Sequence, residues 1–392
     1  MMDNSHLTAS VLESIRPYTD QEVEAAAKAL TQNPEFNMVL RLATPEHADA
    51  FIAAIQAART IKDFKLNFSY KLIKGIVQGN SFSCNISGRS RLGADVPYTF
   101  ISNHRDIVLD SALLNILLVD IGYRLPRIAI GDNLLVRPWV KDLVRLNDSV
   151  IVQRSLPPRQ FLTSAQTLSQ YIRFSIQEDQ SSMWIAQREG RAKDSDDRTQ
   201  IALLKMIALS GEGEVIDRLK SINIAPVSIS YEYDPCDYLK ARELYLRKRN
   251  PEYKKPDGED VLNMKEGIMG YKGRIHFALG TPLNQLLEGV ELPKASNEQL
   301  QLVAATIDRE IHKLYRLYPG NYIAEDLLSE TNTYAQAGHY STSEREHFEK
   351  YLAQQIDKTG LPEEAHEEIR AWLLLMYANP LRNQLKATEV NV

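Results

Sequence analysis

Hydrophobic and polar positions follow a helical period at both ends of the chain. Over residues 1–80, apolar residues recur at intervals of three and four, as in residues 20–30 and 47–64, which predicts amphipathic helices. Gly79 and Asn80 punctuate the end of this segment. The same period returns over residues 291–392. We therefore expect a helical segment at each end of the chain.

The middle of the chain, residues 81–290, has a different pattern, in which short β-like runs are separated by helical stretches such as 164–177 and 198–209. Strands that alternate with helices predict an α/β domain with a central sheet, flanking helices and active loops at the strand ends. The β-like runs are 81–87, 96–102, 127–131, 149–154, 182–188, 225–233 and 273–279.

Composition narrows the function classes. The 392 residues are 44% hydrophobic and 25% charged, as in globular proteins, and the net charge of −5 gives no reason to expect a nucleic-acid partner. Cys84 and Cys236 lack metal-ligand spacing and fit a reducing compartment. The N-terminus lacks a signal-peptide pattern, and no uncharged apolar run reaches 18 residues. We expect a cytoplasmic protein with peripheral contact to the inner face of a membrane.

The segment 101–118 carries the clearest candidate chemistry. A short polar run around His104 lies between a β-like run and a strongly apolar helix. Loops between a strand and a helix often hold reacting groups on a rigid scaffold. Either Asp106 or Asp110 could hold the imidazole and fix its tautomer, which equips His104 as a general base.

Three further segments follow along the chain. In the first, a glycine–x–asparagine–leucine turn precedes a helix and a strand that ends in arginine and serine. In the second, an apolar strand runs into glutamate, glycine and arginine, and in the third a proline begins a strand. These positions are Gly131, Asn133, Leu134, Arg154, Ser155, Glu189, Gly190, Arg191 and Pro226.

In this order, the four segments resemble the glycerolipid acyltransferases, closest to the glycerol-3-phosphate acyltransferase branch. The family's aspartate follows its histidine after four residues, whereas Asp110 follows His104 after five. The family has glutamate–glycine–x–arginine at the third segment. In this chain Arg191 directly follows Gly190, so the motif lacks one residue. The resemblance covers about 200 residues. It implies an α/β domain with a mixed sheet over residues 81–290.

The resemblance implies transfer of a fatty acyl group from acyl-CoA or acyl carrier protein to a hydroxyl of glycerol 3-phosphate. His104 would be the base. Asp110 is its favoured partner because Ser111 continues into the helix as in the family, while Asp106 stays open as the alternative. The resemblance implies no metal and no bound cofactor. The residues expected at the substrate phosphate are Arg154, Arg191, Glu189, Gly190, Arg105 and Ser155, with Lys193 as a further helper.

Local charge supports an anionic partner. Residues 121–160 hold seven cations and three anions, an excess that would attract anionic substrates and lipid headgroups. Residues 244–255 mix aromatic, leucine and basic residues, which suits either an anionic membrane surface or a solvated loop.

The sequence offers three other interpretations. A protein-kinase loop fails, because Ser111 stands where that motif needs asparagine. A lysophosphatidate or amino-lipid acceptor is the rival within the enzyme class. A catalytically inactive membrane-associated scaffold is the non-enzyme alternative, and the two spacing departures are its only support.

Overall fold

The computed structural model describes residues 9–135, 137–154, 156–256 and 258–389. All seven predicted strands form, and they join in one mixed sheet of order β1-β7-β6-β2-β5-β3-β4, which confirms the predicted α/β class. The strands are β1 (Ser83–Ser87), β2 (Thr99–Ser102), β3 (Arg127–Gly131), β4 (Ser149–Val152), β5 (Met183–Ala186), β6 (Ile224–Tyr231) and β7 (Arg274–Leu279).

The direction of the strands determines where the loops gather. Strands β6, β2, β5, β3 and β4 run parallel to one another, and β7 is antiparallel to β6. The carboxyl ends of these five parallel strands therefore lie along one edge of the sheet. Ligands in open α/β sheets bind outside such an edge.

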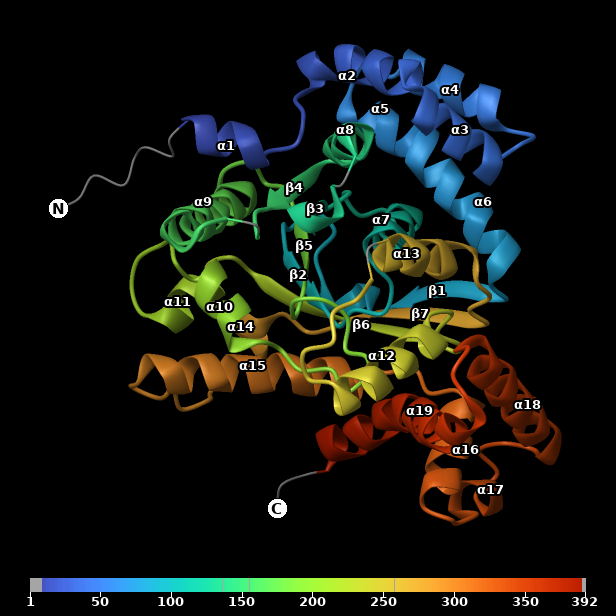
Figure 1. Ribbon diagram of the computed structural model, residues 1–392. Helices are drawn as coiled ribbons and strands as arrows, with labels where there is room; N and C mark the ends of the chain where they lie inside the picture. The colour runs from blue at the N-terminus through green and yellow to red at the C-terminus, as the bar shows by residue number, and fades with distance from the viewer. Residues whose placement is uncertain (1–8, 136, 155, 257, 390–392) are drawn as a thin grey trace.

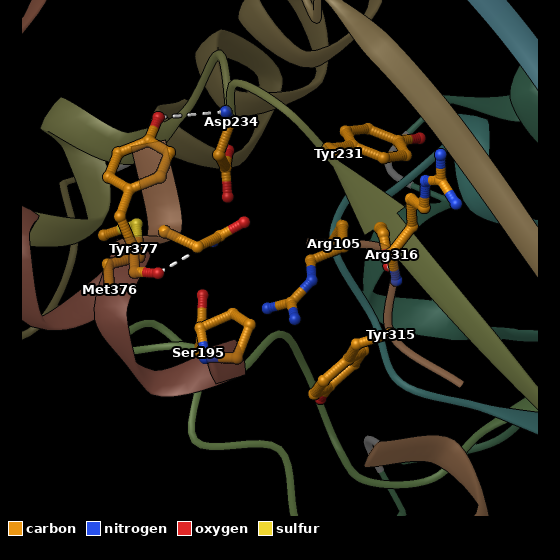
Figure 2. A pocket seen from close by; sticks show the side chains of 11 residues that line it. Arg105, Ser195, Tyr231, Asp234, Tyr315, Arg316, Met376 and Tyr377 are labelled. Atoms are coloured by element: carbon orange, nitrogen blue, oxygen red, sulfur yellow. Dashed lines mark hydrogen bonds between the residues drawn. The ribbon is translucent and has the colours of Figure 1, made fainter. Parts of the chain in front are cut away.

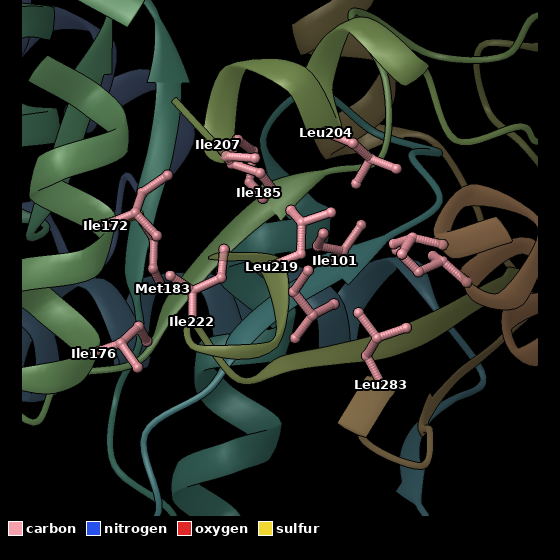
Figure 3. Packing of buried hydrophobic residues seen from close by; sticks show 14 of the residues in the cluster. Ile101, Ile172, Ile176, Met183, Ile185, Leu204, Ile207, Leu219, Ile222 and Leu283 are labelled. Atoms are coloured by element: carbon pink, nitrogen blue, oxygen red, sulfur yellow. The ribbon is translucent and has the colours of Figure 1, made fainter. Parts of the chain in front are cut away.

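Side chains of the strands alternate between two hydrophobic cores, as the period of a strand requires. Ile101 of β2 and Ile185 of β5 belong to one core, and Phe100 and Trp184 belong to the other (Figure 3 shows the first). The helices over the first core are α9 (Pro158–Gln177), α10 (Ile201–Ile207), α11 (Val215–Lys220), α14 (Leu283–Leu286) and α15 (Ser296–Lys313).

The opposite face of the sheet carries the helices nearest to His104. Figure 1 shows α6 (Tyr70–Asn80), α7 (Leu109–Asp120) and α13 (Glu259–Met269) on this side. Helix α7 buries nine of its residues, Asp110 among them. Because α7 is apolar on nearly every side, it packs as an interior helix.

Two helical groups flank the sheet and have cores of their own. The amino-terminal group is α2 (Asp20–Gln32), α3 (Pro34–Ala43), α4 (Ala48–Ala57), α5 (Ile61–Phe64) and the π-helix η1 (Lys65–Ser69), against α8 (Pro138–Leu146). Helix α1 (Ala9–Ile15) instead packs on α9 and β4 and adds Ile15 to the first core of the sheet. The carboxyl-terminal group is α16 (Pro319–Leu328), α17 (Thr333–Gln336), α18 (Thr342–Lys358) and α19 (His366–Thr388), against α12 (Asp237–Arg249). The short 3-10 helices are η2 (Arg89–Arg91), η3 (Asp132–Leu134) and η4 (Glu363–Ala365).

All seven strands lie between residues 83 and 279, while the division into segments 1–80, 81–290 and 291–392 stays a prediction. Within the described ranges, none of the helices is both long enough and apolar enough to cross a bilayer.

Candidate active site

The loop between β2 and α7 is fixed to the neighbouring strand by a side chain. The fully buried Asn103 amide donates to the Ile229 carbonyl at 2.9 Å and accepts from the Ile229 N–H at 2.8 Å. One side chain thus makes the pair of hydrogen bonds that a strand neighbour would make to β6. The position of His104, the next residue, is fixed by this anchor.

His104 and Asp110 are in direct contact. Nδ1 of His104 lies 2.7 Å from Oδ2 of Asp110, whose carboxylate is fully buried. The same oxygen accepts the backbone N–H groups of Arg105 at 2.6 Å and Asp106 at 3.0 Å. Three donors on one oxygen fix the orientation of the carboxylate. The five-residue spacing therefore allows the contact that the family's four-residue spacing implies.

Asp106 has a different position. Its Oδ1 accepts the backbone N–H groups of Val108 at 2.8 Å and Leu109 at 2.7 Å, so it caps the start of α7. Burial raises the pKa of Asp106, and the charge of Asp110 adds to that rise. In this structure Asp106 holds the helix, while Asp110 holds the histidine.

Helix α13 lies directly against this cap. A Cβ atom added at Gly267 would overlap Oδ2 of Asp106, whose other oxygen is held by two N–H groups and yields only with difficulty. We expect Gly267→Ala to lower the free energy of unfolding by about 1–3 kcal/mol, the usual cost of overpacking. Denaturant unfolding measures this change.

The matched control is Gly75→Ala in helix α6. An added Cβ there meets nothing within 4 Å, so the better helix propensity of alanine should raise the free energy of unfolding by about 0.5–1 kcal/mol. If both variants gain stability, α13 does not pack on Asp106 as described.

The imidazole of His104 also contacts an aromatic ring and stays partly exposed. His104 packs edge-on against Trp184, with ring centroids 5.9 Å apart, and 12% of its side chain is exposed. Within the described residues, no hydrogen bond engages Nε2 of His104. That nitrogen is thus unpaired within the described part of the chain.

Arg154 and Glu189 meet where β4 and β5 end. Nη1 of Arg154 lies 3.3 Å from Oε1 of Glu189, and the two side chains are 35% and 72% exposed. A Cβ at Gly131 would come within 3.1 Å of Nε of Arg154, so a glycine there gives the arginine its room. Gly190 has φ of +66°, the left-handed conformation that favours glycine. Ser155 lies outside the described residues.

Arg191 is more deeply placed, beside α13. Its Nη2 donates to Oδ1 of Asn263 at 2.8 Å, and its Nη1 is buried with no partner among the described residues. Burial opposes its charge, but nearby Cys236 and the carboxylates of Asp234 and Asp106 outweigh that effect and raise the pKa of Arg191. Arg191 is therefore a cation whose Nη1 can still donate hydrogen bonds.

The guanidinium of Arg105 is paired with a buried carboxylate. Its Nη2 lies 2.7 Å from Oδ2 of Asp197, with both side chains buried, and the Tyr315 hydroxyl donates to the same oxygen at 2.5 Å. The Lys240 ammonium donates to the Arg105 carbonyl at 3.1 Å and pairs with Asp234. Figure 2 shows the Arg105 guanidinium between Asp234 and Tyr315, on the wall of a cavity of about 30 Å³.

These contacts make Arg105 an anchor of the loop rather than a free phosphate ligand. Lys193 is likewise engaged, 2.5 Å from the buried carboxylate of Glu243. In the parts of the chain that the structure covers, no group of three or more His, Cys, Asp or Glu side chains is arranged to hold a metal ion.

Sequence reasoning missed several residues that build the site. Asn103 directly precedes His104, and an asparagine at a strand end is a recognisable signal for a side chain that pairs with backbone. Asp197 and Asn263 come from distant segments and carry no such local signal.

No known protein family matches the chain, and no curated protein matches its sequence. Among solved structures, it resembles the 1-acyl-sn-glycerophosphate (LPA) acyltransferase PlsC from Thermotoga maritima, with 13% sequence identity and a TM-score of 0.39. The alignment covers 71% of this chain and 97% of that chain. A likeness this distant leaves the function to be argued from the chain's own residues.

Proposed function

We propose that the chain is an acyltransferase that moves a fatty acyl group from a thioester donor to a hydroxyl of glycerol 3-phosphate. The observation that carries the proposal is the 2.7 Å contact between Nδ1 of His104 and Asp110, with Nε2 left unpaired beyond the carboxyl end of β2. The donor is acyl-CoA or acyl carrier protein.

The chemistry needs one proton carrier. Nε2 of His104 takes the proton of the acceptor hydroxyl as its oxygen attacks the thioester carbonyl. The tetrahedral oxyanion then collapses and breaks the carbon–sulfur bond, and the leaving thiolate takes the proton back from the imidazolium. Asp110 stabilises that imidazolium through Nδ1, as the carboxylate does in a catalytic triad.

A covalent acyl-cysteine intermediate is disfavoured. Burial raises the pKa of Cys84 and of Cys236 to about 12, so both thiols stay protonated at neutral pH. The thiolate is the nucleophilic form of cysteine. Direct transfer to the acceptor is therefore the simpler route.

We assign the acceptor phosphate to Arg154, which follows β4, and to Arg191, which follows β5. The ion pair of Arg154 with the exposed Glu189 is worth at most about 1 kcal/mol, so a phosphate dianion can displace the carboxylate cheaply. A planar guanidinium suits phosphate oxygens.

The test is thiol release from palmitoyl-CoA by the purified chain, with glycerol 3-phosphate, lysophosphatidate or glycerol as acceptor, and with and without vesicles rich in phosphatidylglycerol. Release that depends on glycerol 3-phosphate supports the proposal. Release only with lysophosphatidate moves the acceptor to the lyso-lipid. Silence with every acceptor, also with acyl carrier protein as donor carrier, favours a non-catalytic scaffold and contradicts the proposal.

The phosphate assignment predicts a selective effect of Arg154→Gln. The KM for glycerol 3-phosphate should rise by about tenfold to a hundredfold, the loss expected for one hydrogen bond to a charged group. The KM for palmitoyl-CoA should not change. Steady-state kinetics with each substrate varied in turn measure both values.

Arg124→Gln is the matched control. Arg124 lies in the same basic stretch and is 61% exposed, with Asp95 at 3.8 Å and the Gln180 carbonyl at 3.4 Å as its contacts. If the two variants raise the KM equally, the stretch attracts anions by overall charge and Arg154 is not a specific ligand.

A further inference from the structure

The carboxylate that holds His104 has one oxygen unaccounted for. Oδ2 of Asp110 accepts three hydrogen bonds, whereas Oδ1 is buried and has no partner among the described residues. A buried carboxylate oxygen without a donor destabilises the folded protein, because it has lost its hydrogen bonds to water and no protein donor replaces them. Buried polar atoms of this kind call for an explanation.

A donor lies on the same face of the sheet. Tyr231 is the last residue of β6, and Val227 and Ile229, four and two residues before it, belong to the core that Leu109 of α7 shares. Because side chains of a strand alternate, Tyr231 points toward α7 as well, and its ring packs against that core.

The hydroxyl of Tyr231 is itself buried without a partner in the described chain. Burial raises the pKa of Tyr231 well above its ordinary value, and the nearby charges of Asp110 and then Asp106 raise it further. The phenol therefore keeps its proton and remains a donor. Tyr231 and Arg105 line the same cavity (Figure 2), and the backbone N–H of Arg105 is bonded to Asp110.

We propose that Tyr231 donates its hydroxyl proton to Oδ1 of Asp110 and so acts as a positioning residue for His104. This role rests on the proposed function, in which His104 is the base. The two atoms are buried, have no other partner within the described ranges and belong to adjoining elements, α7 and the end of β6. The bond would hold the plane of the carboxylate and share its charge between the phenol and the imidazole.

The test variant is Tyr231→Phe, which removes only the hydroxyl. Asp110 then directs its full charge at His104 and stabilises the imidazolium more strongly, so the acid limb of the kcat/KM profile moves to higher pH. The kcat nevertheless falls about tenfold, as for loss of one charged hydrogen bond, because the plane of the Asp110 carboxylate that orients His104 is no longer held, while the KM values stay unchanged. Incorporation of 3-fluorotyrosine at position 231, a stronger donor, moves the acid limb to lower pH instead.

A readout without turnover separates this inference from the proposed function. The imidazole nitrogen NMR signals of His104, identified by their loss in His104→Ala, should titrate at higher pH in Tyr231→Phe and at lower pH with 3-fluorotyrosine. These shifts appear even if the wild-type chain transfers no acyl group. If Tyr231→Phe does not fold, the 3-fluorotyrosine protein decides.

Tyr123→Phe is the control. The Tyr123 hydroxyl is in the same core and donates to the Leu92 carbonyl at 2.7 Å, away from Asp110. Its loss lowers stability but leaves the His104 titration unchanged. An unchanged titration in Tyr231→Phe, or an equal change in Tyr123→Phe, overturns the assignment.

Discussion

Replacing His104 by alanine is expected to lower kcat for acyl transfer about 10³-fold, because a positioned general base contributes about 10²–10⁴-fold. The variant keeps the thioester and acceptor contacts but has no group to take the hydroxyl proton. The KM values should change little, since the imidazole faces the reacting hydroxyl rather than the substrate phosphate. Thiol release under saturating glycerol 3-phosphate measures the loss.

His276→Gln is the matched control for that result. His276 lies in β7, where Nε2 is 2.9 Å from the Ser87 hydroxyl, and glutamine can keep a polar contact there. This variant should retain activity. Equal losses in both variants, or full activity of a folded His104→Ala protein, would show that His104 is not the base.

The fold was predictable from the sequence because its signals are local. Each β-like run is short, apolar and bounded by turn residues, and each of the seven became a strand. Helix α6 ends at Asn80, where the Gly79–Asn80 pair was expected to end it. The order of the strands in the sheet could not be predicted in this way. Strand β7 lies between β1 and β6, and this placement depends on contacts between residues far apart in the sequence.

The candidate site was predictable only in part. The sequence places both Asp106 and Asp110 within reach of His104. Which of the two contacts the imidazole depends on the residue at which α7 begins. The helix begins at Leu109, so Asp110 is in its first turn and its carboxylate reaches back over the loop, whereas Asp106 precedes the helix and caps it.

The role of each arginine depends on how deeply its side chain is buried. The charged residues around each arginine in the sequence do not reveal that burial. Arg154 is partly exposed and paired with an exposed glutamate, as a ligand of a soluble substrate should be. Arg105 is adjacent to His104 in sequence, yet its partner Asp197 comes from a loop 92 residues away. A prediction from spacing alone treats the two arginines as equivalent.

Breaking the pair of Arg105 and Asp197 is expected to lower the free energy of unfolding by about 3–5 kcal/mol, since Arg105→Leu leaves a buried carboxylate without its cation. The side chains are 6% and 0% exposed, so solvent cannot replace the lost guanidinium. Chemical denaturation of the variant measures this loss, and Arg154→Gln at the exposed pair should cost no more than about 1 kcal/mol.

The double variant Arg105→Leu with Asp197→Asn separates anchoring from ligand binding. Removing both charges should recover much of the stability, because the cost arises from the unpaired carboxylate. The recovered protein should bind glycerol 3-phosphate with an unchanged KM, since the Arg105 guanidinium is bonded to Asp197 and Tyr315 donates to the same oxygen. If the KM instead rises tenfold or more while stability is barely affected, Arg105 contacts the phosphate, and the loop is anchored by Asn103 and Lys240 without it.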